Sequence, residues 1–178
     1  MKKLLMLVPI MLLASSVSYA QSATATANLS VNVGAEAAIV VNSSPAFTSS
    51  GIFGNYTSTT ALTYFVRTIT AGTITVQITT DFSTGGVGGG PSVANPPTSG
   101  DALTYTCTAA APVTGSATAC ATAQTASTGS ATSVVTFGAT TQSAKVGDGT
   151  TTSWVLTNDP SYKAGSYSAV ATYTISAT

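Results

Sequence analysis

Histidine is absent from this 178-residue chain, tryptophan occurs once, and only 6% of the residues are charged. Without histidine, the commonest general base and the usual partner of serine and cysteine nucleophiles are missing. The chain contains only two cysteines, so it also has too few ligands for a zinc-type site. We therefore predict no catalytic residue, no metal ligand, no cofactor and no enzymatic activity.

The acidic residues stand far apart in the sequence, beside turn residues or strand ends, which favours solvated loop carboxylates. In that case function should tolerate the replacement of any one of them. Two alternatives stay open: a carboxylate pair that meets in space, as glycosidases require, and a calcium ion held by Asp101 and Asp148 with neighbouring carbonyl groups. The acidic residues are Glu36, Asp81, Asp101, Asp148 and Asp159.

Long hydrophobic runs are lacking except near the N-terminus. Two lysines precede an apolar stretch at residues 4–14, and Ser18-Tyr19-Ala20 forms a small-x-small cleavage site. The apolar stretch is too short to span a bilayer. We expect a secretory signal peptide over residues 1–20, a mature chain that starts at Gln21, export from the cytoplasm, and no insertion into a membrane.

Positive charge is scarce in the expected mature chain, which keeps only Arg67, Lys145 and Lys163 as basic residues. These are too few to bind a nucleic-acid backbone or an anionic membrane face, so neither is predicted as a partner. The charged fraction of 6% is far below the roughly 25% of a typical globular domain. Such a surface repels its own copies weakly, which fits a protein whose surface is covered by other copies, and it also fits many secreted β-proteins.

What the chain does contain is a series of short alternating or β-branched runs, separated by glycine, proline and asparagine. No stretch of the mature chain keeps a helical period. The pattern predicts an all-β fold, an antiparallel β-sandwich over residues 35–178. The glycine- and proline-rich segment 83–100 is expected to be an exposed loop. The expected strands lie at 35–41, 62–69, 73–79, 103–107, 134–137, 153–156 and 167–175.

The most regular pattern comes first in the mature chain, where apolar and polar residues alternate strictly over residues 23–33. Period two places all the apolar side chains on one face of a β-strand. These residues are Ala23, Ala25, Ala27, Leu29, Val31 and Val33. The segment is either the first strand of a self-contained sandwich or a free strand that pairs with a neighbouring molecule.

The two cysteines, Cys107 and Cys120, predict a disulfide, because an even number in an exported chain favours pairing. A Pro-Val-Thr-Gly segment at 112–115 lies midway between them. A hairpin centred on this segment would place the two cysteines opposite each other, within the roughly 7 Å between Cα atoms that a bridge requires.

Three short motifs occur in order along the chain: Phe-Gly-Asn-Tyr at 53–56, Val-Gly-Asp-Gly-Thr at 146–150, and Ala-Gly-Ser-Tyr at 164–167. They resemble the Phe-Gly-x-Tyr, Trp-Gly-Asp-Gly and terminal Gly-x-Tyr motifs of the spore coat protein U-like pilins, the subunits of archaic chaperone–usher fimbriae. The departures from the family pattern are Val146 in place of its tryptophan, Ala37 and Ala38 where it usually has a cysteine, and Ala169 where it has an aspartate.

This resemblance implies an incomplete immunoglobulin-like sandwich that lacks its final strand and is completed by donor-strand exchange. Residues 21–34 would be the donor strand, and the edge of the last strand would be the acceptor. That edge has none of the charged residues or prolines that usually protect a strand edge. The acceptor-edge residues would be Tyr167, Ala169, Ala171, Tyr173 and Ile175.

The function implied by the resemblance is that of a structural subunit of an extracellular filament on the cell surface. The chain would polymerise with itself, head to tail, and a periplasmic chaperone and an usher would assist. The alternative is a self-complemented secreted adhesin or carbohydrate-binding module. Such a module needs exposed aromatic rings, whereas Trp154 and most tyrosines fall at expected core positions. Three glycosylation sequons, relevant only in a host with the machinery, begin at Asn28, Asn42 and Asn55.

Overall fold

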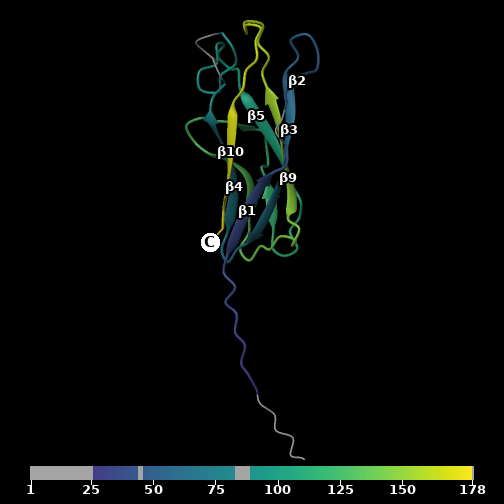
Figure 1. Ribbon diagram of the computed structural model, residues 1–178. Helices are drawn as coiled ribbons and strands as arrows, with labels where there is room; N and C mark the ends of the chain where they lie inside the picture. Colours follow the sequence, from purple (N-terminus) through teal and green to yellow (C-terminus); the bar gives the residue numbers. More distant parts are fainter. Residues whose placement is uncertain (1–25, 44–45, 83–88, 178) are drawn as a thin grey trace, which may run out of the picture. The chain divides into compact units, whose positions relative to one another are not determined.

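The computed structural model of this chain describes residues 26–43, 46–82 and 89–177. The chain divides into two units, residues 1–32 and 33–178. In the first unit, the described residues 26–32 are exposed and form neither strand nor helix. In the second, the described residues form no helix and build two antiparallel sheets in a sandwich, consistent with an immunoglobulin-like fold (Figure 1). The predicted fold class is therefore confirmed.

The two sheets differ in strand order. One has the order β1-β3-β9-β5-β7, and the short β2 pairs with the start of β3; the other has the order β10-β4-β8-β6. All these strand pairs are antiparallel. The strands are β1 (Glu36–Val41), β2 (Thr48–Ser49), β3 (Tyr56–Arg67), β4 (Gly72–Thr80), β5 (Leu103–Ala109), β6 (Ala117–Ala119), β7 (Gln124–Thr125), β8 (Thr132–Phe137), β9 (Asp148–Leu156) and β10 (Val170–Ser176).

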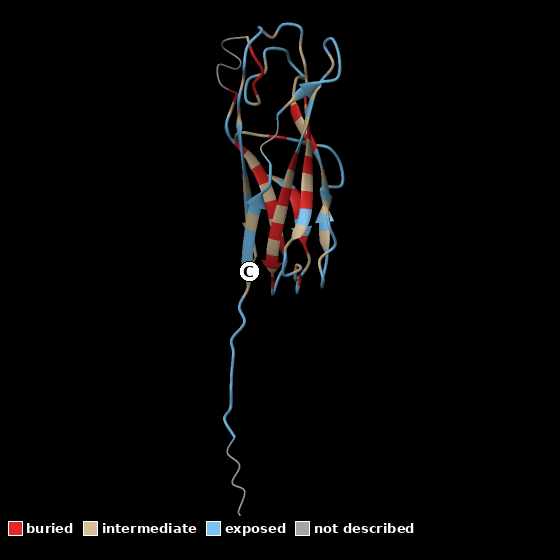
Figure 2. Ribbon diagram, turned by 45° about the vertical axis from the view of Figure 1, so that its right-hand side comes forward, coloured by how far each residue is buried: buried red, intermediate tan, exposed pale blue. Residues whose placement is uncertain are grey.

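The core lies between the central strands of the two sheets. In β3, β4 and β9 buried residues alternate with more exposed ones, so each strand turns one face inward (Figure 2). The rings of Tyr64 and Phe137 lie 5.1 Å apart across the sandwich. The Tyr64 hydroxyl donates to the carbonyl of Ala110 at 2.9 Å, which satisfies its polar atom inside the core.

Each strand expected from the sequence occurs, but several boundaries differ. β3 begins at Tyr56 and β9 at Asp148, ahead of the apolar runs, because threonine-rich stretches pair there; Thr60, for example, lies opposite Thr152. The last strand begins at Val170. The short strands β2, β6 and β7 were not predicted, because two or three residues carry no detectable alternation.

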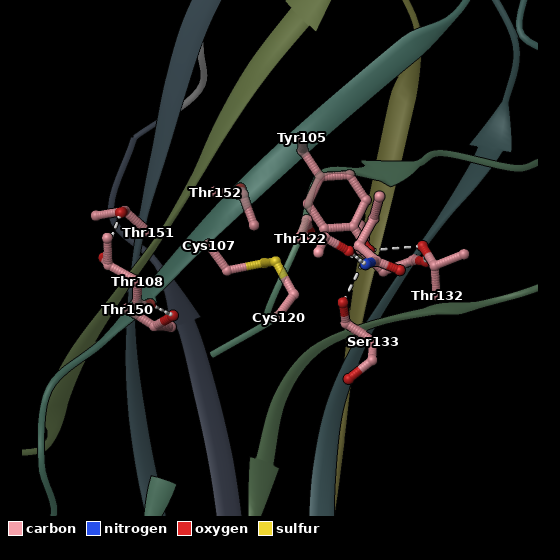
Figure 3. The surroundings of a disulfide bond; sticks show 12 residues. Tyr105, Cys107, Thr108, Cys120, Thr122, Thr132, Ser133, Thr150, Thr151 and Thr152 are labelled. Carbon is pink, nitrogen blue, oxygen red and sulfur yellow. Dashed lines mark hydrogen bonds between the residues drawn. A yellow bond between two sulfur atoms is a disulfide. The ribbon is translucent and has the colours of Figure 1, made fainter. Parts of the chain in front are cut away.

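Cys107 and Cys120 form the predicted disulfide, with their Cα atoms 5.4 Å apart, but the predicted hairpin is wrong. Cys107 lies in β5, whereas Cys120 directly follows β6 in the opposite sheet and donates its amide to Val134 at 3.0 Å. The competing interaction is the pairing of β6 with β8, which places Ala117 opposite the buried Phe137. The disulfide therefore joins the two sheets (Figure 3).

The glycine- and proline-rich segment is a loop, but the expectation that it is simply exposed is wrong in part. Residues 83–88 lie outside the described residues. In the remainder, Gly90, Pro91 and Ser92 are buried. These residues are buried because Asp81 accepts hydrogen bonds from the loop and the ring of Tyr167 packs on Gly90, as described below.

Candidate functional site

The two sheets end side by side along one flank of the sandwich. β1 is the outer strand of one sheet and β10 the outer strand of the other, and the two strands approach each other across the sandwich (Figure 1). We call the end where β1 begins and β10 ends the base. The opposite end, where β10 begins and the β2–β3 hairpin lies, is the distal end.

Inward-facing residues of these two outer strands are uncovered. Val41 of β1 pairs with Leu62, which is only 1% exposed, yet Val41 itself is 51% exposed. Ala171 of β10 pairs with the buried Ile78 and is also exposed. Since residues directly opposite each other on paired strands share a face of the sheet, Val41 and Ala171 both face the interior. This flank lacks the side chains that would close the core.

A groove of about 1140 Å³ lies between the two edges. It occupies the distal half of the flank, because only Val41 of β1 and residues from the first half of β10 line it. Its volume exceeds the roughly 300–1,000 Å³ of a usual small-molecule pocket. Core side chains form its floor: Trp154, Leu156, Leu103, Ile78 and Phe82.

The polar atoms at the groove floor are paired with each other. Trp154 Nε1 donates to Thr60 Oγ1 at 3.0 Å, and the Tyr173 hydroxyl shares a hydrogen bond of 2.5 Å with Thr152 Oγ1. Burial raises the pKa of Tyr173 above its ordinary value, although hydrogen bonds with Thr152, Thr60 and Trp154 oppose the shift. The floor therefore offers mainly apolar contacts to an occupant.

The carboxylate of Asp81 holds the glycine- and proline-rich loop at the distal end. It accepts hydrogen bonds from Ser92 Oγ at 2.6 Å, from the amides of Phe82 and Val93 at 2.8 Å each, and from the amide of Ala94 at 3.1 Å. Burial alone would raise the pKa of Asp81, but these hydrogen bonds outweigh it and hold the pKa below its ordinary value. The predicted solvated carboxylate is wrong at this position.

Tyr167 packs directly on this loop and forms the rim of the groove. A Cβ atom on Gly90 would lie only 2.1 Å from Tyr167 Cε1, so the ring fits because glycine has no side chain. The Tyr167 hydroxyl donates to the carbonyl of Lys163 at 2.9 Å, and the Lys163 amide donates to the carbonyl of Gly89 at 2.7 Å. The segment before β10 and the loop thus form one wall.

The other aspartates each accept a hydrogen bond from a different part of the chain. Asp101 accepts a hydrogen bond of 2.9 Å from the Tyr162 hydroxyl, so it too is more than a solvated carboxylate. Asp148 accepts from the amide of Ala144 at 3.1 Å, and Asp159 from that of Ser161 at 2.6 Å. Among the described residues, no group of three or more histidine, cysteine, aspartate or glutamate residues could hold a metal ion. None of the described segments forms an apolar helix long enough to cross a membrane.

The three sequence motifs occupy turns near the ends of strands. Phe53 adopts a φ of +56° in the β2–β3 hairpin, and the carbonyl of Gly54 accepts a hydrogen bond from Asn158 Nδ2 at 3.0 Å. Gly147 has a φ of +82°, and a Cβ atom there would lie 2.4 Å from Thr63 Cγ2. Gly147 therefore has a structural reason to be glycine; the third motif, at 164–167, lines the groove.

The expected acceptor edge is largely brought together at the groove. Tyr167, Ala169, Ala171 and Tyr173 line it, whereas Ile175 lies nearer the base, opposite Ile74. Tyr167 and Ala169 precede β10, so the ladder covers only part of the predicted edge. The opposite wall, from residues 43, 46, 47, 49, 51, 53 and 56, could not be predicted, because its short strand and turns carry no sequence pattern.

The described part of the expected donor strand presents its apolar side chains to solvent. Leu29 is 96% exposed and Val31 85% exposed; Val33 and Ala27 are exposed as well. Ala23 and Ala25 lie outside the described residues. Large aliphatic side chains at this exposure are costly to leave uncovered when several share one face of an extended segment.

Comparisons with known proteins give no further guide to the groove's role: no protein-family model, curated protein or solved structure matches the chain significantly.

Proposed function

We propose that this chain is a structural subunit of an extracellular filament, a pilin-like protein without enzymatic activity, in which residues 23–33 of one copy fill the groove of the next. The observation that carries the proposal is the open flank. Val41 and Ala171 face the interior of the sandwich on either side of the groove, yet both are exposed. A strand laid between them would cover both and would add a neighbour to β10.

The exposed N-terminal segment has the properties that such an occupant needs. Main-chain groups of an added strand would pair with the outer edge of β10, and its alternate side chains would enter the groove. Leu29, Val31 and Val33 are the large apolar residues on one face of this segment. At about 1.5–3 kcal/mol for each large aliphatic side chain fully buried, the three contribute about 5–8 kcal/mol.

The taper of the donor segment favours antiparallel entry beside β10. The groove lies in the distal half of the flank, where β10 begins. An antiparallel donor places the large Leu29, Val31 and Val33 toward this groove and the small Ala23 and Ala25 toward the base. A parallel donor would place the alanines at the groove and the large residues toward the base. All the strand pairs described in the two sheets are also antiparallel.

A donor at one end and an acceptor groove elsewhere on the same chain make a heterologous contact. Such a contact does not close on itself when repeated, so it generates a fibre. The intramolecular disulfide fits assembly outside the reducing cytoplasm. A secreted filament on the cell surface, assembled with a chaperone and an usher that cover the open flank beforehand, is the localisation that we propose.

The test is a pair of charge substitutions on opposite faces of the donor segment. We expect Leu29→Asp to abolish fibres, because the carboxylate would be buried in an apolar groove without a partner. Ser30→Asp carries the same charge one residue away on the solvent-facing side and should leave fibres intact. Negative-stain microscopy and sedimentation measure both. Equal loss in the two variants, or fibres in both, would contradict the proposal.

A second candidate function, a carbohydrate-binding module, has one observation in its favour. Partly exposed tyrosines line the groove, namely Tyr56, Tyr162, Tyr167 and Tyr173. Trp154, however, is only 3% exposed, and three of the four hydroxyls already have protein partners. Binding of soluble oligosaccharides by a non-polymerising Leu29→Asp variant would favour this function over the filament.

A further inference from the structure

The connection between the donor segment and the body of the domain is very short. The donor face ends at Val33 and β1 begins at Glu36, so only Gly34 and Ala35 lie between them. The three residue steps from Val33 to Glu36 span at most about 11 Å. If the donor segment fills the groove of a neighbouring copy, the base of the donating domain must therefore lie close to the mouth of that groove.

Arg67 shortens the free connection further. Its Nε donates to the carbonyl of Gly34 at 2.9 Å, and its Nη2 lies 2.9 Å from Glu36 Oε1. The backbone just ahead of β1 is thereby held on the base of its own domain. The point from which the chain leaves the sandwich is therefore held at Gly34.

The two ends of the sandwich both carry exposed apolar side chains. At the distal end, Ile52 is 94% exposed and Phe53 61% exposed, and Phe53 lies at the groove. At the base, the exposed apolar residues sit in three different turns, namely Ile69, Val113 and Val146. Strand directions place these two sets at opposite ends, since Tyr56 starts β3 distally and Arg67 ends it at the base.

We propose that the distal hairpin of one copy, with Ile52 and Phe53, docks on the base of the next copy, around Ile69 and Val146. This end-to-end contact rests on the proposed filament function and adds a second interface to it. Antiparallel entry brings Val33 out of the groove at the distal end, beside Phe53. The short, Arg67-fixed junction then sets the base of the donating domain against that hairpin. The partner is a second copy of this chain.

The direct test is cysteine cross-linking in assembled fibres of the full chain. Phe53→Cys is combined with Val146→Cys in one variant and with Ile69→Cys in another, and a short bismaleimide is added. We expect a covalent ladder on denaturing, reducing gels from at least one of the two. Single-cysteine variants, and Phe53→Cys combined with Ser133→Cys on the exposed face of β8, should give no ladder.

The outcomes separate this inference from the proposed function. Fibres without a ladder from either pair would overturn the end-to-end contact and leave donor-strand assembly standing. If the unmodified chain formed no fibres, both the end-to-end contact and the proposed filament function would be contradicted. A ladder from two base positions, Ile69→Cys with Val146→Cys, and none with Phe53→Cys would indicate base-to-base packing and also overturn the inference.

A second measurement uses fibre stiffness and needs no cross-linker. The Ile52→Asp variant keeps the donor segment and every residue that lines the groove, so it should still form fibres. We expect the persistence length measured in micrographs to fall at least two-fold, because the second contact at each junction is weakened. A Ser133→Asp control should match the unmodified chain. Unchanged stiffness in the Ile52→Asp variant would contradict the proposed contact.

Discussion

At the scale of single residues, Asp81 is the charged group most deeply involved in the structure. Its carboxylate accepts four hydrogen bonds that fix the loop at the distal end of the groove. Sequence reasoning treated it as a solvated loop carboxylate, because nothing in the neighbouring residues shows that the chain returns to it at Ser92. The hypothesis that any acidic residue can be replaced without effect therefore needs a separate test at this position.

We predict that Asp81→Asn lowers the free energy of unfolding by about 1–3 kcal/mol at neutral pH, because an amide group cannot accept all four bonds. Asp159→Asn removes the same charge from a carboxylate that accepts the amide of Ser161 two residues away, and it should cost less. Denaturant unfolding of a non-polymerising variant such as Leu29→Asp measures both. Equal effects would contradict the special role of Asp81.

The same carboxylate predicts a pH dependence with a definite sign. The pKa of Asp81 is lower in the folded chain than its ordinary value, so its stabilisation is fully present above about pH 3.9 and is lost as the pH falls through the folded pKa. The stability difference between the unsubstituted background and Asp81→Asn should therefore shrink on acidification below about pH 4. A difference that grows on acidification would contradict this assignment.

At the scale of elements, the loop and the segment before β10 form one wall through the contact of Tyr167 with Gly90. We predict that Gly90→Ala destabilises the fold by about 1–3 kcal/mol, because the new methyl group would overlap the tyrosine ring. Gly129→Ala is the matched control, since a Cβ atom there meets nothing closer than Ser127 Oγ at 3.8 Å. Thermal unfolding measures the loss of stability in both variants. A similar loss in the two would contradict close packing of Tyr167 on Gly90.

The disulfide is the second prediction at this scale. Because it joins β5 to the strand end after β6 in the opposite sheet, its removal loosens the two sheets and not a single hairpin. We expect the Cys107→Ser/Cys120→Ser double variant to lose about 3 kcal/mol of stability through greater freedom of the unfolded chain. Unfolding curves with and without reductant check this. Stability that does not change would contradict a structural role.

Strands with a clear alternation could be predicted from the sequence, and their partners could not. The residues 73–79 alternate visibly and form the middle of β4. By contrast, the central position of the turn between Cys107 and Cys120 predicted a hairpin. Instead, β6 pairs with β8 in the other sheet. Local symmetry fixes a turn only when no other strand offers a better apolar partner, and Phe137 offers one to Ala117.

At the scale of the whole molecule, the main feature is the open interior of the sandwich, which the described residues of one domain do not close. The groove floor between β1 and β10 and the exposed face of residues 27–33 are both apolar. In the filament that we propose, one chain carrying both features would supply a donor to one neighbour and an acceptor to another. Directional growth of a fibre would follow from that arrangement.

The most direct measurement is amide exchange in β10 of a variant that lacks residues 21–33, with and without a peptide of residues 23–33. We predict that the variant is aggregation-prone, and that the peptide makes it soluble and slows exchange at β10 amides that face away from β4. A peptide with Leu29→Asp should do neither. A stable, soluble variant whose β10 exchange ignores the peptide would contradict donor-strand completion.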